Sequence, residues 1–209
     1  MSISVKPRFI TFEGIDGCGK STQAKLLIQK LEDEGKEVVF VREPGGTDIS
    51  EQVRNILLHS GGDEMTGRTE ALLMTASRAQ LTKEVIIPSL NNGKWVVADR
   101  YADSTLAYQG GGRIIDLEWL IELNQFATFA LQPDLTFFVD VLPEIGFERQ
   151  GGSPDRIERA GLDFQANVRQ MYMKMTKRFS DRIVLVDGNH TIDSIQDVII
   201  STLTKRNFI

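Results

Sequence analysis

A glycine-rich stretch near the N-terminus constrains the fold more than any other feature of the sequence. Residues 14–21 read Gly-Ile-Asp-Gly-Cys-Gly-Lys-Ser and match the pattern G-x-x-x-x-G-K-[ST]. A mostly apolar run at 8–13 precedes this stretch, and residues 23–34 carry apolar side chains at helical spacing. The sequence therefore predicts a buried strand, a phosphate-binding loop and a helix in succession, because a helix N-terminus attracts the bound anion.

Each fixed position of this pattern has a physical task in binding a nucleotide. Glycines let backbone N–H groups curl around phosphate oxygens. Lys20 places a positive charge on the β- and γ-phosphates, and the Ser21 hydroxyl is a ligand suited to Mg²⁺. We expect ATP to be bound by Gly14, Ile15, Asp16, Gly17, Cys18, Gly19, Lys20, Ser21 and Thr22.

The rest of the chain alternates between strand-like and helix-like segments. Further strands are predicted at 37–41, 94–98, 135–141 and 183–186, and helices at 23–34, 49–58, 70–90, 117–130, 163–179 and 192–204. Pro88 is expected to interrupt the last turn of the third helix, and the segments 43–46 and 109–113 are expected to be loops. This alternation is typical of the α/β class, with a parallel five-stranded sheet flanked by helices on both faces. Because no segment resembles a linker, we expect a single domain over residues 1–209.

Composition excludes several classes of protein. The 209 residues include 24 basic and 29 acidic side chains, and this balance disfavours a general nucleic-acid binder. No apolar run reaches the ~20 residues that cross a bilayer, and residues 1–8 lack the apolar stretch of a signal peptide. Cys18 is the single cysteine, so it forms no intrachain disulfide. We expect a reduced, cytoplasmic protein that binds neither nucleic acid nor membrane.

The phosphate-binding loop indicates a nucleotide but leaves the reaction open among GTPases, ATP-driven motors and kinases. The chain lacks the guanine-reading signature N-K-x-D, and it is small, with no extra module for coupling hydrolysis to motion. Phosphoryl transfer between two nucleotides requires cations for both sets of phosphates, and planar guanidinium groups suit that task. Arginines follow the predicted strands or lie in the predicted loops and helices beyond them: Arg42, Arg54, Arg78, Arg100, Arg113, Arg149, Arg156 and Arg159. These features favour a kinase.

Two carboxylates compete for a position near a bound Mg²⁺. Asp99 and Asp140 each follow an apolar run, and ligands of open parallel sheets gather at the carboxyl ends of strands. We favour Asp99 because Arg100 and a polar loop follow it, while Asp140 is followed by two apolar residues and is suited to capping the next element. Asp16, inside the loop, is expected to face a sugar hydroxyl or a metal-bound water.

Several segments together resemble the bacterial thymidylate kinase family, a branch of the P-loop nucleoside monophosphate kinases. The matching segments are FEGIDGCGKST at 12–22, REPGGT at 42–47, EALL at 70–73 with Arg78, DRYADSTLAYQG at 99–110 and DRIE at 155–158. They occur in the order expected of the family and span most of the chain. REPGGT and DRY are more specific than the phosphate-binding loop.

The resemblance implies a kinase that transfers a phosphoryl group from Mg-ATP to dTMP by direct in-line displacement, giving dTDP for dTTP synthesis. It implies that Asp16 holds the 3′-hydroxyl, that Arg100 contacts the acceptor phosphate, and that Asp99 positions Mg²⁺ through water while Ser21 binds it. The implied dTMP site comprises Asp16, Glu43, Pro44, Arg54, Met74, Arg78, Arg100, Thr105, Tyr108 and Gln109. Within it, Arg54 faces the monophosphate, Arg78 donates to the thymine carbonyl edge and Tyr108 closes the space beside C2′.

The family resemblance also implies a homodimer and a lid over about 148–160. The residue after Asp16 is Gly17, where some relatives carry an arginine, so the resemblance assigns the catalytic arginine to the lid: Arg149 first, then Arg156 and Arg159. Met74 stands where many relatives stack a phenylalanine on the base, and a thioether also packs on an aromatic face. The alternatives are a kinase for another acceptor, such as dUMP or a deoxynucleoside, and a P-loop ATPase without kinase activity. Adenine contacts are expected from the 187–189 loop, and His59 and His190 lie outside all motifs.

Overall fold

A parallel sheet forms the centre of the computed structural model, which describes residues 6–59, 65–151 and 155–209. Its five strands lie in the order β2-β3-β1-β4-β5. They are β1 (Phe9–Glu13), β2 (Val38–Arg42), β3 (Trp95–Asp99), β4 (Leu135–Asp140) and β5 (Ile183–Asp187). Each pair of neighbours runs parallel, which confirms the predicted sheet.

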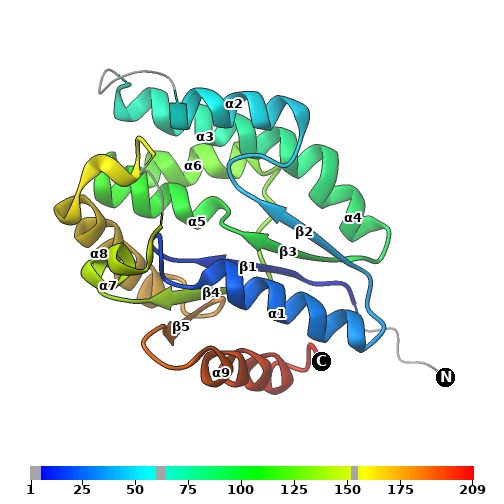
Figure 1. Ribbon diagram of the computed structural model, residues 1–209. Coiled ribbons are helices and arrows are strands. Elements are labelled where there is room, and N and C mark those ends of the chain that lie inside the picture. The colour runs from blue at the N-terminus through cyan, green and yellow to red at the C-terminus, as the bar shows by residue number, and fades with distance from the viewer. Residues whose placement is uncertain (1–5, 60–64, 152–154) are drawn as a thin grey trace.

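Helices cover both faces of this sheet (Figure 1). Helices α1 (Lys20–Asp33) and α9 (Ile192–Lys205) pack side by side on one face. On the other side lie α2 (Asp48–His59), α3 (Gly67–Leu81), α5 (Ala102–Thr105) and α6 (Leu117–Ala127). Helices α7 (Pro143–Arg149) and α8 (Leu162–Arg178) pack together near the end of β4. Among the described residues, none of the helices has the length and apolarity needed to cross a membrane.

The central strand explains why the sheet needs cover on both faces. All of β1 is buried, and successive side chains of a strand point to opposite faces. Ile10 and Phe12 share a hydrophobic cluster with residues of α1, whereas Phe9 packs with Leu81 and Tyr101. The run of apolar residues that predicted a buried strand is therefore matched by helices on either side.

The predicted helix at 70–90 is interrupted earlier than expected. Helix α3 passes into a π-helical segment, η1 (Thr82–Ile86), which leads to α4 (Ile87–Asn91). Proline lacks the N–H that an α-helix needs, and the Ile87 N–H donates to Thr82 O across a wider turn just before Pro88. Pro88 therefore begins the last short helix and does not end it.

The predicted glycine-rich loop at 109–113 is wrong, because most of this stretch belongs to a π-helix, η2 (Leu106–Gly112). The glycines allow close packing against α8. A Cβ at position 111 would lie 2.7 Å from the Met171 Cβ atom and 2.8 Å from Asn167 O, and one at position 112 would collide with the Phe164 ring. Gly111 and Gly112 thus serve helix contact, a role that local turn rules do not distinguish from a loop.

Candidate active site

The predicted phosphate-binding loop lies between β1 and α1, at the carboxyl end of the sheet's central strand. Gly14 has φ +143°, and a Cβ there would lie 2.5 Å from Val139 O, so the loop passes too close to β4 for a side chain. Gly19 caps α1 with a left-handed backbone at φ 96°. The backbone of the motif thus turns tightly, and the N-terminus of α1 begins at the end of the sheet where the strands have their carboxyl ends.

Lys20 and Asp16 face each other across the loop. The Lys20 Nζ atom lies 3.3 Å from Ile15 O and 3.4 Å from the Asp16 Oδ1 atom. Burial opposes ionisation of Asp16, but the charges of Arg100 and Lys20 outweigh it and hold the pKa of that carboxyl well below its ordinary value. Asp16 therefore stays an acceptor, suited to a hydroxyl group or a metal-bound water.

Arg100 connects the end of β3 to the loop. Its backbone has φ 73°, unusual for a residue with a side chain, and its Nη1 atom donates to Gly14 O at 2.8 Å. Its Nη2 atom lies 2.6 Å from the Asp16 Oδ1 atom and 3.0 Å from the Tyr108 hydroxyl. The Tyr108 hydroxyl also donates to the Asp16 Oδ2 atom at 3.2 Å. Three residues from distant segments thus form one cluster beside the loop.

The two carboxylates that the sequence offered as Mg²⁺-side residues, Asp99 and Asp140, have different partners in the structure. The Ser21 hydroxyl donates a short hydrogen bond to the Asp99 Oδ2 atom. Asp140 instead pairs with Arg169, whose Nε and Nη2 atoms lie 2.7 Å and 2.8 Å from its two oxygens. Asp99 is therefore the carboxylate beside the phosphate-binding loop.

The oxygen atoms of Ser21 and Asp99 fit Mg²⁺, which is usually held by one or two carboxylates, substrate phosphates and water. Among the described residues, no group of three or more His, Cys, Asp or Glu side chains is arranged to hold a metal ion. An ion at this position would therefore depend on phosphate and water ligands as well as on the protein.

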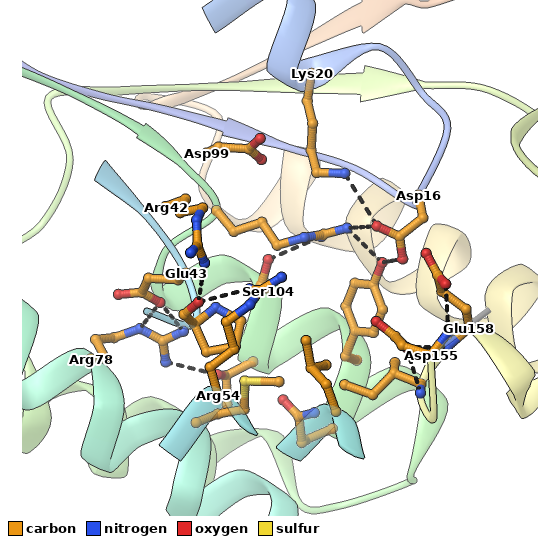
Figure 2. Close-up of a pocket in the computed structure, with 18 of the residues that line it drawn as sticks. Asp16, Lys20, Arg42, Glu43, Arg54, Arg78, Asp99, Ser104, Asp155 and Glu158 are labelled. Carbon is orange, nitrogen blue, oxygen red and sulfur yellow. Dashed lines mark hydrogen bonds and ion pairs between the residues drawn. The ribbon is translucent and has the colours of Figure 1, made fainter. Parts of the chain in front are cut away.

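A pocket opens on the other side of Arg100, between the loop and helices α2, α3 and η2. Figure 2 shows Lys20, Asp99 and Asp16 at one end of it, Glu43 and Arg78 at another, and Asp155 and Glu158 along the side. The lining includes all ten residues predicted to bind the acceptor: Asp16, Glu43, Pro44, Arg54, Met74, Arg78, Arg100, Thr105, Tyr108 and Gln109. The folded chain brings these distant segments to one cavity.

Arg78 and Glu43 form a buried pair in the wall of this pocket. The Arg78 Nε and Nη2 atoms lie 2.8 Å and 2.6 Å from the Glu43 Oε2 atom. The remaining Arg78 donors reach Thr105 Oγ1 at 2.7 Å, Asn124 Oδ1 at 2.7 Å and Tyr101 O at 2.9 Å. Each nitrogen of the guanidinium thus donates to at least one protein acceptor.

Glu43 has an unusual proton affinity. Burial raises its pKa to about 7, and the Arg78 charge only partly offsets that effect. Its Oε1 atom is buried and has no hydrogen-bond partner among the described residues. The pocket wall therefore carries a carboxyl group that titrates near neutral pH.

Basic residues at the mouth of the pocket are held by the REPGG segment. The Arg54 Nη1 atom donates to Pro44 O at 2.8 Å, and the Arg42 Nη1 atom donates to the same oxygen at 3.0 Å. Arg42 also pairs with Glu51 at 3.0 Å. Two guanidinium groups from β2 and α2 thus converge beside Pro44, a suitable place for an anionic group.

The arginines of the predicted lid occupy different places, and residues 152–154 of that segment lie outside the described residues. Arg149 ends α7, donates to Gly188 O at 3.1 Å and lines a second cavity with Lys20, Ser21 and Thr191. Arg156 is buried against Glu70, at 2.8 Å. Arg159 lies exposed in the short helix η3 (Glu158–Ala160).

The second cavity, on the α1 and α9 side of the loop, accounts for other predicted positions. Gly17, Cys18, Gly19 and Thr22 line it. Gly188, from the loop expected to contact adenine, and the largely exposed His190 also line it. The loop therefore has a cavity on each side, one at Arg100 and one at Arg149.

Sequence reasoning missed two buried carboxylates beside the site. Glu13 accepts hydrogen bonds from Tyr101 N at 2.8 Å, Ser104 Oγ at 2.6 Å and Tyr172 Oη at 2.7 Å, and burial raises its pKa. Glu70, fully buried in α3, accepts from Gln109 Nε2 at 2.8 Å. A charged residue ending an apolar strand was a signal for Glu13, but Glu70 reads in sequence as an ordinary first-turn helix acid.

Comparisons with known proteins agree on one family. The thymidylate kinase family model matches residues 12–199. A thymidylate kinase of Fervidobacterium nodosum is 47% identical over 193 residues, covering 92% of this chain and 96% of the relative, and one of Chlorobium luteolum is 45% identical over 210 residues, covering 94% and 97%. The crystal structure of thymidylate kinase from Ehrlichia chaffeensis has a TM-score of 0.79 at 32% identity, covering 94% of this chain and 98% of that one. This chain belongs to the thymidylate kinase family.

Proposed function

We propose that this chain is a dTMP kinase, which transfers the γ-phosphoryl group of ATP to dTMP and produces dTDP and ADP. The observation that carries the proposal is the position of Arg100, between the phosphate-binding loop and a pocket lined by residues of α2, α3, α5 and η2. A cation at this point can face the phosphates of both substrates. The family assignment names the acceptor class that such a pocket serves.

In the proposal, ATP binds along the loop, with its phosphates on the backbone of residues 14–19 and on Lys20, and its adenosine beside the cavity that includes Gly188 and Thr191. The monophosphate of dTMP faces Arg100, Arg54 and Arg42. In the proposal Asp16 and Tyr108, which line the pocket together, hold the sugar, with Asp16 accepting from the 3′-hydroxyl and the Tyr108 ring beside C2′. No strong general base is needed, because a phosphate oxygen is already a nucleophile, so catalysis consists of positioning and charge neutralisation.

The thymine is proposed to lie against Met74, Thr105 and Gln109, with Arg78 at its carbonyl edge. Because each Arg78 nitrogen already donates to a protein acceptor, a thymine carbonyl would share or replace one of them. Of these acceptors, Glu43 and Thr105 belong to residues that line the pocket, and the uncharged Thr105 hydroxyl is the one we propose that the carbonyl replaces. Pro44 packs at the side of the same pocket.

We propose that Mg²⁺ accompanies ATP, held by the Ser21 hydroxyl and, through water, by Asp99. When bound, the ion would neutralise charge on the β- and γ-phosphates. Among the lid arginines we favour Arg149 as the catalytic one, because it lines the cavity beside Lys20, while Arg156 is engaged by Glu70. The proposal treats residues 1–209 as a single kinase domain with a lid over about 148–160, acting in the cytoplasm, where nucleotides are made.

We also propose a homodimer whose contact includes α3 and α6. Leu72 on α3 is 51% exposed, and Trp119 and Phe126 on α6 are 40% and 85% exposed. Trp119 and Phe126 are seven residues apart and so share one face of α6, which itself packs on α3. A second copy of the chain is the occupant that this face fits, and F126E is expected to yield a monomer in sedimentation equilibrium.

The test of function is ADP release from Mg-ATP in the presence of dTMP, dUMP, UMP, dCMP, dGMP or AMP. Strong stimulation by dTMP, weaker stimulation by dUMP and almost none by the others is expected. Broad stimulation would keep the kinase and remove the thymine preference. ATP hydrolysis that ignores every monophosphate would overturn the proposal in favour of an ATPase.

A further inference from the structure

A buried carboxylate in α3 joins three segments that surround the acceptor pocket. Glu70 has no exposed surface, and its Oε1 atom accepts from Gln109 Nε2 at 2.8 Å and from Arg113 Nε at 3.2 Å. Its Oε2 atom accepts from Arg113 Nη2 at 3.0 Å and from Arg156 Nη1 at 2.8 Å. One side chain thus connects η2, the residue after it and the segment at 155–160.

The charge on Glu70 is preserved despite its burial. Burial raises the pKa of a carboxyl group, but hydrogen bonds from Arg113, Gln109 and Arg156, with the Arg113 charge, outweigh it and lower the pKa of Glu70. An ionised buried carboxylate is stable only while its cationic partners stay in place. The position of Glu70 and the positions of its partners therefore depend on one another.

Segment 155–160 borders the acceptor pocket, and its attachment depends strongly on Arg156. Asp155, Ile157 and Glu158 line the pocket. The Asp155 Oδ1 atom accepts from Glu158 N at 2.9 Å, and the Glu158 Oε2 atom accepts from Asp155 N at 2.8 Å. These two reciprocal hydrogen bonds stabilise the turn. Arg156 attaches that turn to the helices through Glu70 and through Leu57 O on α2, at 2.8 Å.

Arg156 would be poorly satisfied without Glu70. The guanidinium is buried, and its Nη2 atom has no hydrogen-bond partner among the described residues. Loss of the Glu70 charge would leave this buried cation with the Leu57 carbonyl as its principal acceptor. The segment would then lose the ion pair that joins it to α3.

We propose that Glu70 is a positioning residue that couples the base side of the acceptor pocket, through Gln109, to the segment that lines its other side, through Arg156. The inference rests on the proposed function, because it assigns the base to Gln109. Glu70 touches no substrate in this account. Because Glu70 holds both Gln109 and Arg156, the two sides of the pocket are ordered together. Binding of dTMP and the native position of segment 155–160 therefore favour each other.

The test is a double-mutant cycle with E70Q, R156Q and E70Q/R156Q, assayed for the KM of dTMP and of ATP. Each single variant is expected to raise the KM for dTMP by roughly ten-fold and to change the KM for ATP by less than about two-fold. Because both changes break the same link, the double variant should exceed the larger single effect by no more than about two-fold. A rise in the dTMP KM of the double variant equal to the product of the two single rises would overturn the proposal. Equal rises in the KM for dTMP and the KM for ATP would do the same, and Glu70 would then be a structural ion-pair residue.

Controls separate this link from general damage. R156Q leaves Glu70 with Arg113 and Gln109, so it keeps the proposal testable if E70Q does not fold. E118Q removes a carboxylate that pairs with Arg178 at the surface and should leave both KM values unchanged. R156K, which keeps a cation beside Glu70, should recover part of the dTMP affinity lost in R156Q, and no recovery would count against the ion pair as the link.

A second readout needs no turnover. Hydrogen exchange of segment 155–160 is expected to slow on addition of dTMP to the wild-type chain and to respond much less in R156Q. An equal response of the two chains would overturn the coupling. If the wild-type chain releases no ADP with dTMP, the proposed function fails; if it does and the variants keep the wild-type KM for dTMP, only this inference fails.

Discussion

Arg100 and Asp16 form an ion pair at 2.6 Å between the end of β3 and the phosphate-binding loop. The pair joins residues that are 84 positions apart and lies where the pocket lined by Tyr108 and Gln109 meets the loop. The Arg100 side chain is oriented by Gly14 O and by Tyr108 as well, so the cation is fixed before any substrate binds. Preorganised charge of this kind stabilises a transition state without reorganisation at the moment of reaction.

Lys20→Ala tests the phosphate-binding loop. We expect turnover to fall by roughly 10²-fold or more, because the principal point charge on the transferred phosphate is removed. Circular dichroism and thermal unfolding should show an intact fold, since among the described residues the Lys20 amine donates hydrogen bonds only to Ile15 O and Asp16. Near-normal turnover would contradict the assignment of the loop.

Arg149→Ala tests the choice of catalytic arginine. We expect kcat to fall by roughly 10- to 100-fold with little change in the KM for dTMP, because a lid arginine acts mainly in the transition state. Arg178→Ala is the matched control, since Arg178 pairs with Glu118 at the surface, away from both cavities. An unchanged kcat in Arg149→Ala would shift the role to Arg159 or Arg156.

Asp99→Asn and Asp140→Asn separate the two carboxylates that the sequence left in competition. Because Asp99 accepts from Ser21 beside the loop, its amide variant should require roughly ten-fold more Mg²⁺ for half-maximal activity. Asp140→Asn weakens the pair with Arg169 and should lower the free energy of unfolding by about 1 kcal/mol without altering the Mg²⁺ dependence. Titrations of activity with Mg²⁺ decide between them, and the reverse pattern would restore Asp140 as the metal-side residue.

Glu43→Gln tests the raised pKa in the pocket wall. Because the pKa of Glu43 in the folded chain is about 7 and its ordinary value is 4.5, the folded state holds a proton that the unfolded chain releases in that interval. Its contribution to the free energy of unfolding is therefore full below pH 4.5 and is lost as the pH rises through about 7. The loss should be on the order of 1–3 kcal/mol.

Urea unfolding of the wild-type chain and Glu43→Gln at several pH values measures this loss. At low pH the protonated Glu43 is as neutral as glutamine, so the two chains should be similarly stable there. The variant should change less between pH 5 and pH 7, because glutamine does not titrate. Parallel pH profiles for the two chains would show that Glu43 titrates in its ordinary range. The Arg78 charge would then lower the pKa of Glu43 as much as burial raises it.

Local patterns were sufficient for the strands and for the motif residues at their ends. Leu135 to Val139 reads as a buried strand from its apolar residues, and β4 occupies that segment. In contrast, the stretch from Gln109 to Gly112 reads as a loop but is π-helical, because its glycines are required by α8 and not by a turn. Helices α5 and α7 are four and seven residues long, too short to show a hydrophobic period.

The sequence by itself determined the α/β class, the glycine-rich loop and the set of residues that line the pocket beside Arg100, because each depends on neighbours in the chain or on a motif. Only the tertiary structure decided which carboxylate stands beside Ser21, which lid arginine is engaged by Glu70, and how Glu13 and Glu70 are satisfied. Those pairings join segments far apart in the chain. Burial and charge at such contacts arise from packing, which residue spacing does not encode locally.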